Sequence, residues 1–572
     1  MIPNRQGFIF EQFLVVGLLP YKSEQQSAQV LYRYPPASAS PEIPKVDNNE
    51  DESTKFVPIS GANAAIPFGQ VIRFCFPKGI DYKSLCIAKP KSELHNILFG
   101  EVDMEKAENS FVFIGSNEDT LFYGLAVINE ELLERPPSFM AHGLPPGSWS
   151  SALINDTILT TNRVYVLISR FPFFKVHFSV LYSIISRERL YALEESTANS
   201  SDITPGNKEL KVVSINEIVT IIQTYYSLPP PAISQSLQFK IPTSSINIEI
   251  EYPKGDHDRL LCDWTIPVIF RCLKLESIML LISSIMLEKH IVIECSNIGI
   301  LSCLVLSIIV LFRPYVWQGP FISGLPVEIQ EYLLAPVPFI VGVLSLPKLI
   351  ERQLEAVIIK IDATTEQIIL PKDLALLPMP KLKQLENNLR PYHTFLSNCT
   401  NDRFASPYRT TEKQVEAAHK IMEELKNYQQ DIINVLLPFI SSTSDTDQII
   451  SKVQEEPSLK KKEKEFLVQF INTQSFSMYL DDMIANISEE AEHNREVATH
   501  LDEKIRQLEL NRTQAIAKAK YYEQEAAELG ERIESLREAR QSLHVGSKTR
   551  TFNLNSSVEL LKQSFKEKIN NK

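Results

Sequence analysis

The chain has 572 residues, and at roughly 150 residues per domain this length allows about four structural units rather than one compact fold. Its 58 Lys and Arg residues against 70 Asp and Glu residues give a formal net charge of −12. Most of the surface therefore repels polyphosphates, and nucleic acid is a poor candidate partner. A hydrophobic fraction of 44% with 22% charged residues excludes global disorder and supplies apolar surface for several cores.

Cysteine usage and the layout of the apolar runs indicate a reduced, cytoplasmic setting. The seven cysteines are scattered and include no C-x-x-C pair, which indicates neither a disulfide framework nor a structural zinc site. Residues 1–19 lack the basic-then-apolar layout of a secretory signal, so we expect the chain to begin here. The longest apolar run, Ile298–Phe312, is shorter than the ~20 residues of a spanning helix. It predicts a buried core helix and no transmembrane segment.

Short runs rich in β-branched and aromatic residues predict a sheet in the first 185 residues. The runs lie at 13–19, 30–34, 71–74, 111–115, 122–127 and 163–169. After them, apolar residues from Phe173 to Ile185 recur at helical spacing, and Pro172 suits the first turn of a helix laid on that sheet. Between 36 and 66 the chain turns rich in Pro, Ser and Asn with an acidic string, which predicts a disordered insert.

The following segments change from a spacer to alternating helices and strands. Residues 186–234 are predicted to be a spacer with a short helical connector at 215–226 and a proline run that stops it. Helix, strand and helix are then expected at 273–287, 290–295 and 298–312, with Ser296 and Asn297 capping the last helix and further strands at 338–343 and 356–361. These runs are typical of parallel strands covered on both faces. From 374 to 484 the periodic stretches, such as 411–439 and 461–484, predict a helical module.

A single heptad register fits residues 498–543 and predicts a coiled-coil helix about 70 Å long. Its seam includes Leu501, Ile505, Leu508, Leu529, Ile533 and Leu536. Three alanines and two arginines at core positions weaken the seam, so a homodimer and a lone charged helix folded on the body both remain open. The basic segment 546–572 is predicted to be a solvated tail, with a membrane-surface role as the alternative.

Motifs for covalent chemistry are missing from the sequence. It contains no G-x-x-x-x-G-K-[ST], G-x-G-x-x-G, H-E-x-x-H or G-x-S-x-G, so phosphate cradling, zinc hydrolysis and a nucleophile elbow lack their minimal residues. We therefore expect no catalytic residue, no metal and no cofactor, and a function that depends on surface shape.

Four blocks in a fixed order resemble the DENN family. The resemblance rests on Phe10–Leu18, Leu31–Pro36, Phe74–Gly79, Phe111–Phe113, Tyr123–Gly124 and Ile168–Phe174 in the first block, on Leu281–Ser296, Arg313–Gln318 and Ala335–Gly342 in the second, on Ile358–Asp362 with Leu377–Pro378 in the third, and on Phe466–Phe476 in the fourth. Together the blocks cover roughly residues 8 to 484, and the coiled coil lies outside them.

The resemblance implies an α/β fold in several parts. It implies a longin-like upstream lobe at 8–185 with the insert at 36–66, the spacer at 186–234, a central α/β sandwich at 235–345 and a mostly helical downstream module at 346–484. The coiled coil at 485–545 and the basic tail at 546–572 would follow. The long insert and the long spacer leave open how the two lobes are tied together.

The resemblance further implies guanine nucleotide exchange on a Rab-family GTPase in membrane trafficking, with peripheral recruitment to vesicle or endosomal membranes. Exchange needs no covalent step, because a factor that binds the nucleotide-free GTPase more tightly than the GDP form accelerates release. The GTPase would touch both lobes, so neither lobe alone should be active. Two alternatives remain open: GTPase activation through Arg170, and a non-catalytic scaffold that recruits partners through the coiled coil.

Candidate contact residues lie in the most family-like stretch of the central block: Trp317, Gln318, Tyr332, Pro336 and Pro338. An aromatic and proline-rich segment there would present a rigid surface, although the same residues could simply pack a corner between a strand and a helix. Arg170, between a strand end and a helix start, is either an anchor for that turn or, by analogy with DENN-like relatives of the folliculin type, an arginine finger for GTP hydrolysis.

Overall fold

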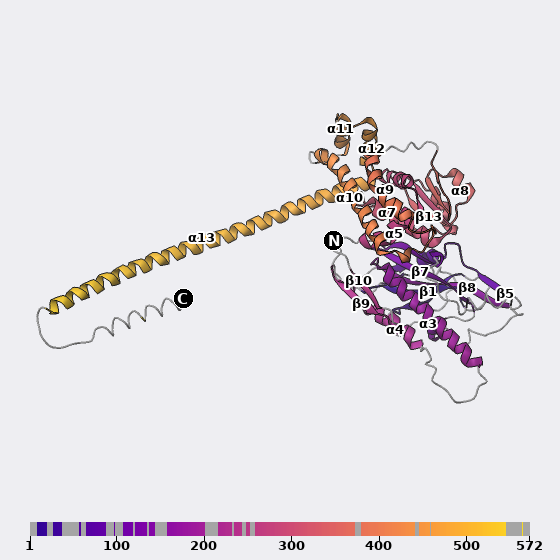
Figure 1. Cartoon of the computed structure of the whole chain (residues 1–572), viewed down its shortest axis with the longest axis horizontal. Coiled ribbons are helices and arrows are strands. Elements are labelled where there is room, and N and C mark those ends of the chain that lie inside the picture. The colour runs from indigo at the N-terminus through magenta and orange to yellow at the C-terminus, as the bar shows by residue number, and fades with distance from the viewer. Residues whose placement is uncertain are drawn as a thin grey trace. The chain divides into compact units, whose positions relative to one another are not determined.

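The computed structural model describes residues 8–19, 27–36, 56–58, 65–86, 97, 107–117, 120–133, 137–143, 157–200, 215–231, 234–242, 247–251, 258–371, 379–440, 446–457, 459–544 and 563 (Figure 1). The chain divides into two compact units, Met1–Asp481 and Asp482–Lys572. The first unit combines sheets with many helices, which confirms the predicted mixed α/β class.

The first lobe is built on a six-stranded antiparallel sheet with strand order β2-β1-β8-β7-β6, and β5 also pairs with β8. Its strands are β1 (Gln12–Gly17), β2 (Gln29–Tyr34), β5 (Tyr82–Cys86), β6 (Ser110–Asn117), β7 (Thr120–Leu132) and β8 (Thr157–Ser169). The sheet is accompanied by α3 (Phe174–Ser200), α4 (Ile215–Tyr226) and two short 3₁₀ turns, η2 (Ala107–Asn109) and η3 (Ser138–Gly143). All residues of β1 are buried, and this strand lies between the edge strand β2 and the central strand β8.

Three expectations for this lobe are corrected. The run 71–74 is not a strand but part of helix α1 (Phe68–Cys75), because its buried residues Val71 and Cys75 lie four apart and share one helical face. Within the insert predicted to be disordered, β3 (Phe56–Pro58) and β4 (Ala65–Pro67) pair in an antiparallel ladder, while 37–55 and 59–64 lie outside the described residues. Helix α3 continues beyond Ile185 to Ser200, into the predicted spacer.

The central sheet has the strand order β12-β13-β11-β14-β15. Its strands are β11 (Ile291–Cys295), β12 (Phe321–Ile322), β13 (Ile340–Val343), β14 (Val357–Ile361) and β15 (Glu366–Ile369), all paired in parallel except for the last pair. The helices of this block are α5 (Asp258–Cys272), α6 (Leu275–Met286), α7 (Ile298–Phe312), α8 (Lys348–Gln353) and the 3₁₀ segment η4 (Val327–Leu334). The predicted helix, strand and parallel pairing are confirmed, whereas α5 and the hairpin of β9 (Ser236–Lys240) and β10 (Asn247–Glu251) were not predicted.

Helix α7 joins the first lobe to the central block. Nearly all of its side chains are buried, and its N-terminus is capped as predicted, because the Asn297 side chain accepts a hydrogen bond from the Ile300 amide at 3.0 Å. The Val112 amide of β6 donates to the Ser302 hydroxyl of α7 at 3.3 Å, and the Ser323 hydroxyl donates to the Val112 carbonyl at 3.0 Å. The two lobes thus share hydrogen bonds across a buried apolar contact.

The downstream block is helical, as predicted. It contains α9 (Leu382–Ser397), the 3₁₀ turn η5 (Pro407–Arg409), α10 (Glu412–Ile440), α11 (Thr446–Glu455), α12 (Lys461–Ile471) and α13 (Gln474–His544). The periodic stretch 461–484 is split into α12 and the start of α13. At that start, the Glu288 carboxylate accepts from the Gln474 amide at 3.0 Å and from the Ser475 amide at 2.8 Å. A side chain from a turn of the central block therefore caps the long helix.

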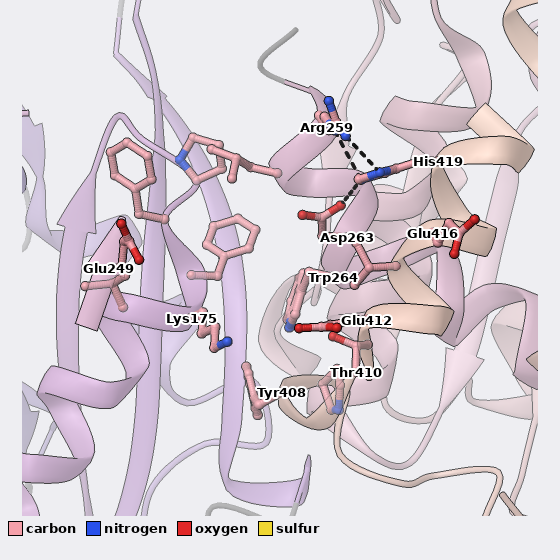
Figure 2. A pocket seen from close by; sticks show the side chains of 17 residues that line it. Lys175, Glu249, Arg259, Asp263, Trp264, Tyr408, Thr410, Glu412, Glu416 and His419 are labelled. Carbon is pink, nitrogen blue, oxygen red and sulfur yellow. Dashed lines mark hydrogen bonds and ion pairs between the residues drawn. The ribbon is translucent and has the colours of Figure 1, made fainter. Parts of the chain in front are cut away.

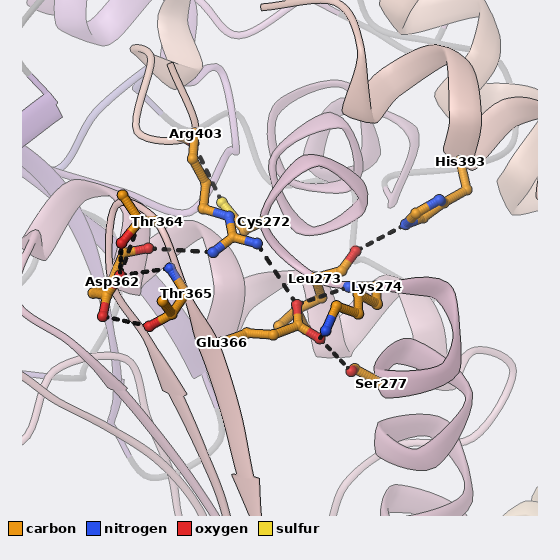
Figure 3. Close-up of polar contacts among 10 residues, drawn as sticks. All are labelled: Cys272, Leu273, Lys274, Ser277, Asp362, Thr364, Thr365, Glu366, His393 and Arg403. Carbon is orange, nitrogen blue, oxygen red and sulfur yellow. Dashed lines mark hydrogen bonds and ion pairs between the residues drawn. The ribbon is translucent and has the colours of Figure 1, made fainter. Parts of the chain in front are cut away.

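A second carboxylate connects the central sheet to a helix start (Figure 3). Glu366 accepts from the Lys274 amide at 2.9 Å and from the Ser277 hydroxyl at 2.7 Å, both at the N-terminus of α6. Lys274 precedes this helix and has no acceptor to cap it, so Glu366 supplies the negative charge that a helix N-terminus favours. The guanidinium of Arg403 lies 3.8 Å from the same carboxylate, which ties the downstream block to the sheet.

The second unit consists of the continuing helix α13, which runs through the whole predicted heptad stretch. The seam side chains Leu501, Ile505, Leu508, Leu529, Ile533 and Leu536 are all exposed on it. The predicted basic tail lies outside the described residues apart from 563. Among the described helices, none has the length and apolar character that crossing a membrane requires.

We expect Ile293→Ala to lower the free energy of unfolding by roughly 2 to 5 kcal/mol, because Ile293 is fully buried in the middle strand of the central sheet and its truncation leaves a cavity. Leu349→Ala is the control, since that side chain is largely exposed on α8 and its loss should change stability by no more than about 0.5 kcal/mol. Urea unfolding of both variants measures the difference. An equal loss of unfolding free energy in the two variants would contradict the assignment of Ile293 to the core.

Candidate functional site

Exposed apolar side chains lie on η4, on the segment after it and on α8, and η4 and α8 contact each other. We call Val327, Tyr332, Leu334, Val337 and Leu349 the apolar ridge. Each of them is exposed, and Tyr332 (69%) and Leu349 (71%) are the most exposed of the five. The elements beneath are well anchored, because η4 and α8 pack on one hydrophobic cluster through residues such as Leu333 and Ile350. A firmly packed segment that presents an aromatic and several aliphatic side chains to solvent is typical of a protein-binding surface.

The ridge begins at the boundary with the first lobe. The Val327 amide donates to the Pro77 carbonyl at 2.9 Å, so the turn that follows α1 lies directly against the start of η4. Lys78 and Gly79 in that turn are exposed, and Gly79 has a φ of +80°, a conformation that favours glycine. A partner on the ridge would therefore reach the first lobe at the same time.

The structure divides the residues predicted for partner contact into two groups. Tyr332 and Pro336 are exposed, and Tyr332 belongs to the ridge. Trp317, Gln318 and Pro338 are half-buried at a tight turn: the Trp317 indole donates to the Pro320 carbonyl at 3.3 Å, and Gln318 donates to the Val316 carbonyl at 3.0 Å. These contacts favour a packing role for Trp317 and Gln318.

The same turn explains the glycine at position 319. A Cβ atom there would lie 2.2 Å from the Pro338 carbonyl oxygen, so only glycine allows the two backbone segments to approach this closely. The turn and the segment before β13 are thus fixed relative to each other, which favours a packing role for Pro338 as well.

A cleft of about 810 Å³ lies where the first lobe, the central block and the downstream block meet (Figure 2). Its floor is apolar and includes Phe173, Phe174 and Trp264. The Trp264 and Phe174 rings make an edge-to-face contact at 4.9 Å between centroids. Its rim carries charges of both signs: Lys175, Glu249, Arg259, Asp263, Glu412 and Glu416. The cleft has the size of a site for a side chain or a loop rather than for a whole protein.

His419 on α10 links the cleft wall to α5. One ring nitrogen, Nε2, hydrogen-bonds the Asp263 carboxylate, and the Arg259 guanidinium lies 3.2 Å from the other, Nδ1. The Nε atom of Arg259 also lies 3.4 Å from Nε2, so both ring nitrogens face polar groups of α5. Because both ring nitrogens contact residues of α5, His419 connects α10 to α5; we call Arg259, Asp263 and His419 the latch.

Arg170 is held in an ion pair inside the first lobe. Its Nε lies 3.2 Å from an oxygen of Glu11, and the two side chains are 27% and 7% exposed. Burial raises the pKa of Glu11 to about 7, and the positive charge of Arg170 counteracts part of that rise. An arginine finger has to reach a bound nucleotide, so this geometry favours the anchoring role for Arg170.

The described residues offer little for metal or thiol chemistry. Among them, no group of three or more His, Cys, Asp or Glu side chains is placed to hold a metal ion. Burial raises the pKa of Cys272 to about 11, so its thiol stays protonated near neutral pH.

Comparison with known families identifies the central part of the chain. Residues 160–365 match the family model described as the DENN (AEX-3) domain. The chain contains a DENN domain. This match includes Arg170, the turn at Trp317 and the whole apolar ridge, and it ends before the downstream helices and α13.

Curated relatives match parts of the chain. It is 30% identical over 187 residues to the MAP kinase-activating death domain protein of Caenorhabditis elegans, covering 31% of this chain and 13% of that protein. It is 23% identical over 367 residues to DENN domain-containing protein 2C of Mus musculus (63% and 31%) and 25% identical over 183 residues to DENN domain-containing protein 1A of Homo sapiens (31% and 18%). The chain spans less than a third of the length of each of these relatives.

Sequence reasoning missed most of the ridge and all of the cleft. Val327, Leu334, Val337 and Leu349 are ordinary aliphatic residues. Only the place of the first three between β12 and β13, and of Leu349 on the short helix α8, could have suggested exposure. The cleft is lined by segments as distant in the sequence as 172–176 and 407–419. No local sequence pattern predicts that these two segments lie close together.

Glu11 gives a testable pH dependence. The pKa of Glu11 is about 7 in the folded chain and about 4.5 in the unfolded chain, so between these pH values the folded chain binds more protons. The free energy of unfolding is therefore highest below about pH 4.5 and falls as the pH rises to about 7. The shift corresponds to roughly 3 kcal/mol at most. We expect Glu11→Gln to lose less stability than the natural chain between about pH 5 and about pH 8. Urea unfolding of both at each pH measures this, and identical pH dependences would contradict it.

Proposed function

We propose that this chain is a guanine nucleotide exchange factor for a Rab-family small GTPase in membrane trafficking. The observation that carries the proposal is the apolar ridge, which lies within the matched DENN domain and borders the first lobe. The proposal includes a first lobe of the longin type, which its antiparallel sheet and the covering helix α3 support. It also includes recruitment to membranes through partners rather than by a spanning segment.

The mechanism requires only binding. The ridge supplies an exposed tyrosine and several exposed aliphatic side chains, which are typical of an interface centre. Exposed charged residues such as Glu331 and Lys348 lie among them on η4 and α8. A GTPase held there would meet Lys78 of the first lobe and the ridge together. Contacts that fit the nucleotide-free arrangement of the switch loops better than the GDP-bound arrangement lower the affinity for GDP and accelerate its release.

GTPase activation receives less support. Its predicted residue, Arg170, is paired with the nearly buried Glu11. Single-turnover GTP hydrolysis by the GTPase, measured with and without the full chain, tests this alternative. An unchanged rate would exclude GTPase activation, whereas a faster rate that Arg170→Ala abolishes would support it.

The exchange activity is tested by adding the full chain to a panel of Rab GTPases that carry fluorescent GDP. We expect faster GDP release from at least one member of the panel, and no acceleration of any member would overturn the proposal.

The ridge is tested on whichever GTPase responds. Tyr332→Ala should lower the catalytic efficiency of exchange about 10- to 100-fold, since truncating an interface tyrosine of this kind typically costs about 2 kcal/mol. Tyr521→Ala is the matched control, because Tyr521 is 63% exposed on α13, far from the DENN domain in the chain. Equal activity of the two variants would show that the partner binds elsewhere.

A further inference from the structure

The seam of α13 is an unpartnered apolar face. Along 501–540 the described a and d side chains of the heptads are exposed, including Leu501, Ile505, Leu508, Ile533 and Leu536. Large aliphatic side chains that recur every three and four residues on one face of a helix lose the benefit of burial unless another helix covers them. The remaining faces are mostly polar, with Leu510, Ile516 and Tyr521 as exposed apolar exceptions, so the seam is the one face on which large apolar residues recur at heptad spacing.

We propose that a second copy of this chain covers the seam and that the two helices run antiparallel. In such a pair each a residue faces a d residue of the other copy, and full overlap of 501–540 places the two-fold axis between Lys520 and Tyr521. The resulting layers join Leu501 with the partner's Arg540, Ile505 with the partner's Leu536, Leu508 with the partner's Ile533, Arg512 with the partner's Leu529, Ala515 with the partner's Ala526, and Ala519 with the partner's Tyr522.

Side-chain volume favours this direction over a parallel pair. In a parallel pair Tyr522 would face the partner's Tyr522, between layers in which Ala519 and Ala526 face only alanine. Two bulky rings beside two thin layers leave both overpacking and voids. In the antiparallel pair the large Tyr522 faces the small Ala519, so no layer holds two rings, while Ala526 still faces only an alanine, the partner's Ala515.

Charge favours the same direction. In a parallel pair the core positions would bring Arg512 against the partner's Arg512 and Arg540 against the partner's Arg540. Beside the core, Arg532 at a g position would face the partner's Arg537 at an e position. The antiparallel pair places the core arginines opposite leucines, on which their aliphatic stems can pack while the guanidinium groups reach solvent.

Flanking charges do not reverse this preference. The antiparallel pair brings Lys518 beside the partner's Glu525. A parallel pair has its own attractive contacts, from Lys504 to the partner's Glu509 and from Lys518 to the partner's Glu523. These are exposed pairs, which contribute little, whereas the repelling arginines lie in or beside the core of the pair.

The oligomeric state tests whether the seam is occupied by a second copy. Light scattering of the full chain should give twice the 65.1 kDa chain mass. Leu508→Glu should convert the dimer to a monomer, because it places a carboxylate in the seam. Leu510→Glu is the matched control: Leu510 is 59% exposed against 62% for Leu508, but it lies on the opposite face, so this variant should stay dimeric. A monomeric natural chain, or equal behaviour of both variants, would overturn the proposal.

Disulfide trapping tests the direction. Leu501 and Arg540 lie about 58 Å apart along one helix, so cysteines at both positions cannot join within a chain. In a Cys399→Ser background, which removes the exposed cysteine of the described residues, the double variant Leu501→Cys with Arg540→Cys should form covalent dimers on oxidation. Each single variant should not. Covalent dimers of the Leu501→Cys variant alone would establish a parallel pair and overturn the antiparallel assignment.

Discussion

The organisation of the first unit depends on one constraint: helix α7 has no polar face. Nearly every side chain from Ile298 to Phe312 is buried, so the helix needs cover on all sides. The central sheet and α5 supply part of that cover, and strand β6 of the first lobe supplies another part. The contact between the lobes is therefore a consequence of folding α7, and the Ser302 hydroxyl bonded to the Val112 amide adds a directional contact to it.

Features that depend on local pattern were predictable from the sequence. The apolar run of α7, its cap at Asn297 and the short strand β11 all appear where periodicity and capping placed them. The prediction for 71–74 failed, because three apolar or aromatic residues in a four-residue segment fit a strand and a helix equally well. The buried residues Val71 and Cys75 lie four apart, as one face of a helix requires. Helix α5 was missed because it is apolar on several faces and contains Pro267.

Long-range caps could not be predicted at all. Glu288 caps α13 and Glu366 caps α6, and each lies far along the chain from the helix start that it serves. The residue directly before α6 is Lys274, whose side chain has no hydrogen-bond acceptor.

The same limit applies to the candidate site. Tyr332 was identified from its neighbourhood in the sequence, whereas the surrounding ridge depends on how η4 and α8 pack on a shared cluster. The three-residue latch of Arg259, Asp263 and His419 likewise exists only in the folded chain.

Rigidity connects these observations to the proposed function. A factor that adapted equally well to the GDP-bound and the nucleotide-free GTPase would bind both states with the same affinity and would not accelerate release, however tightly it bound. The ridge meets this requirement because its base is packed, its first turn is bonded to Pro77 of the other lobe, and the lobes are joined through α7. Two lobes hinged loosely around an exposed tyrosine would retain the contact but lose the discrimination. The apolar character of the buried helix α7 is therefore what would make a binding surface on two lobes selective for one state of the GTPase.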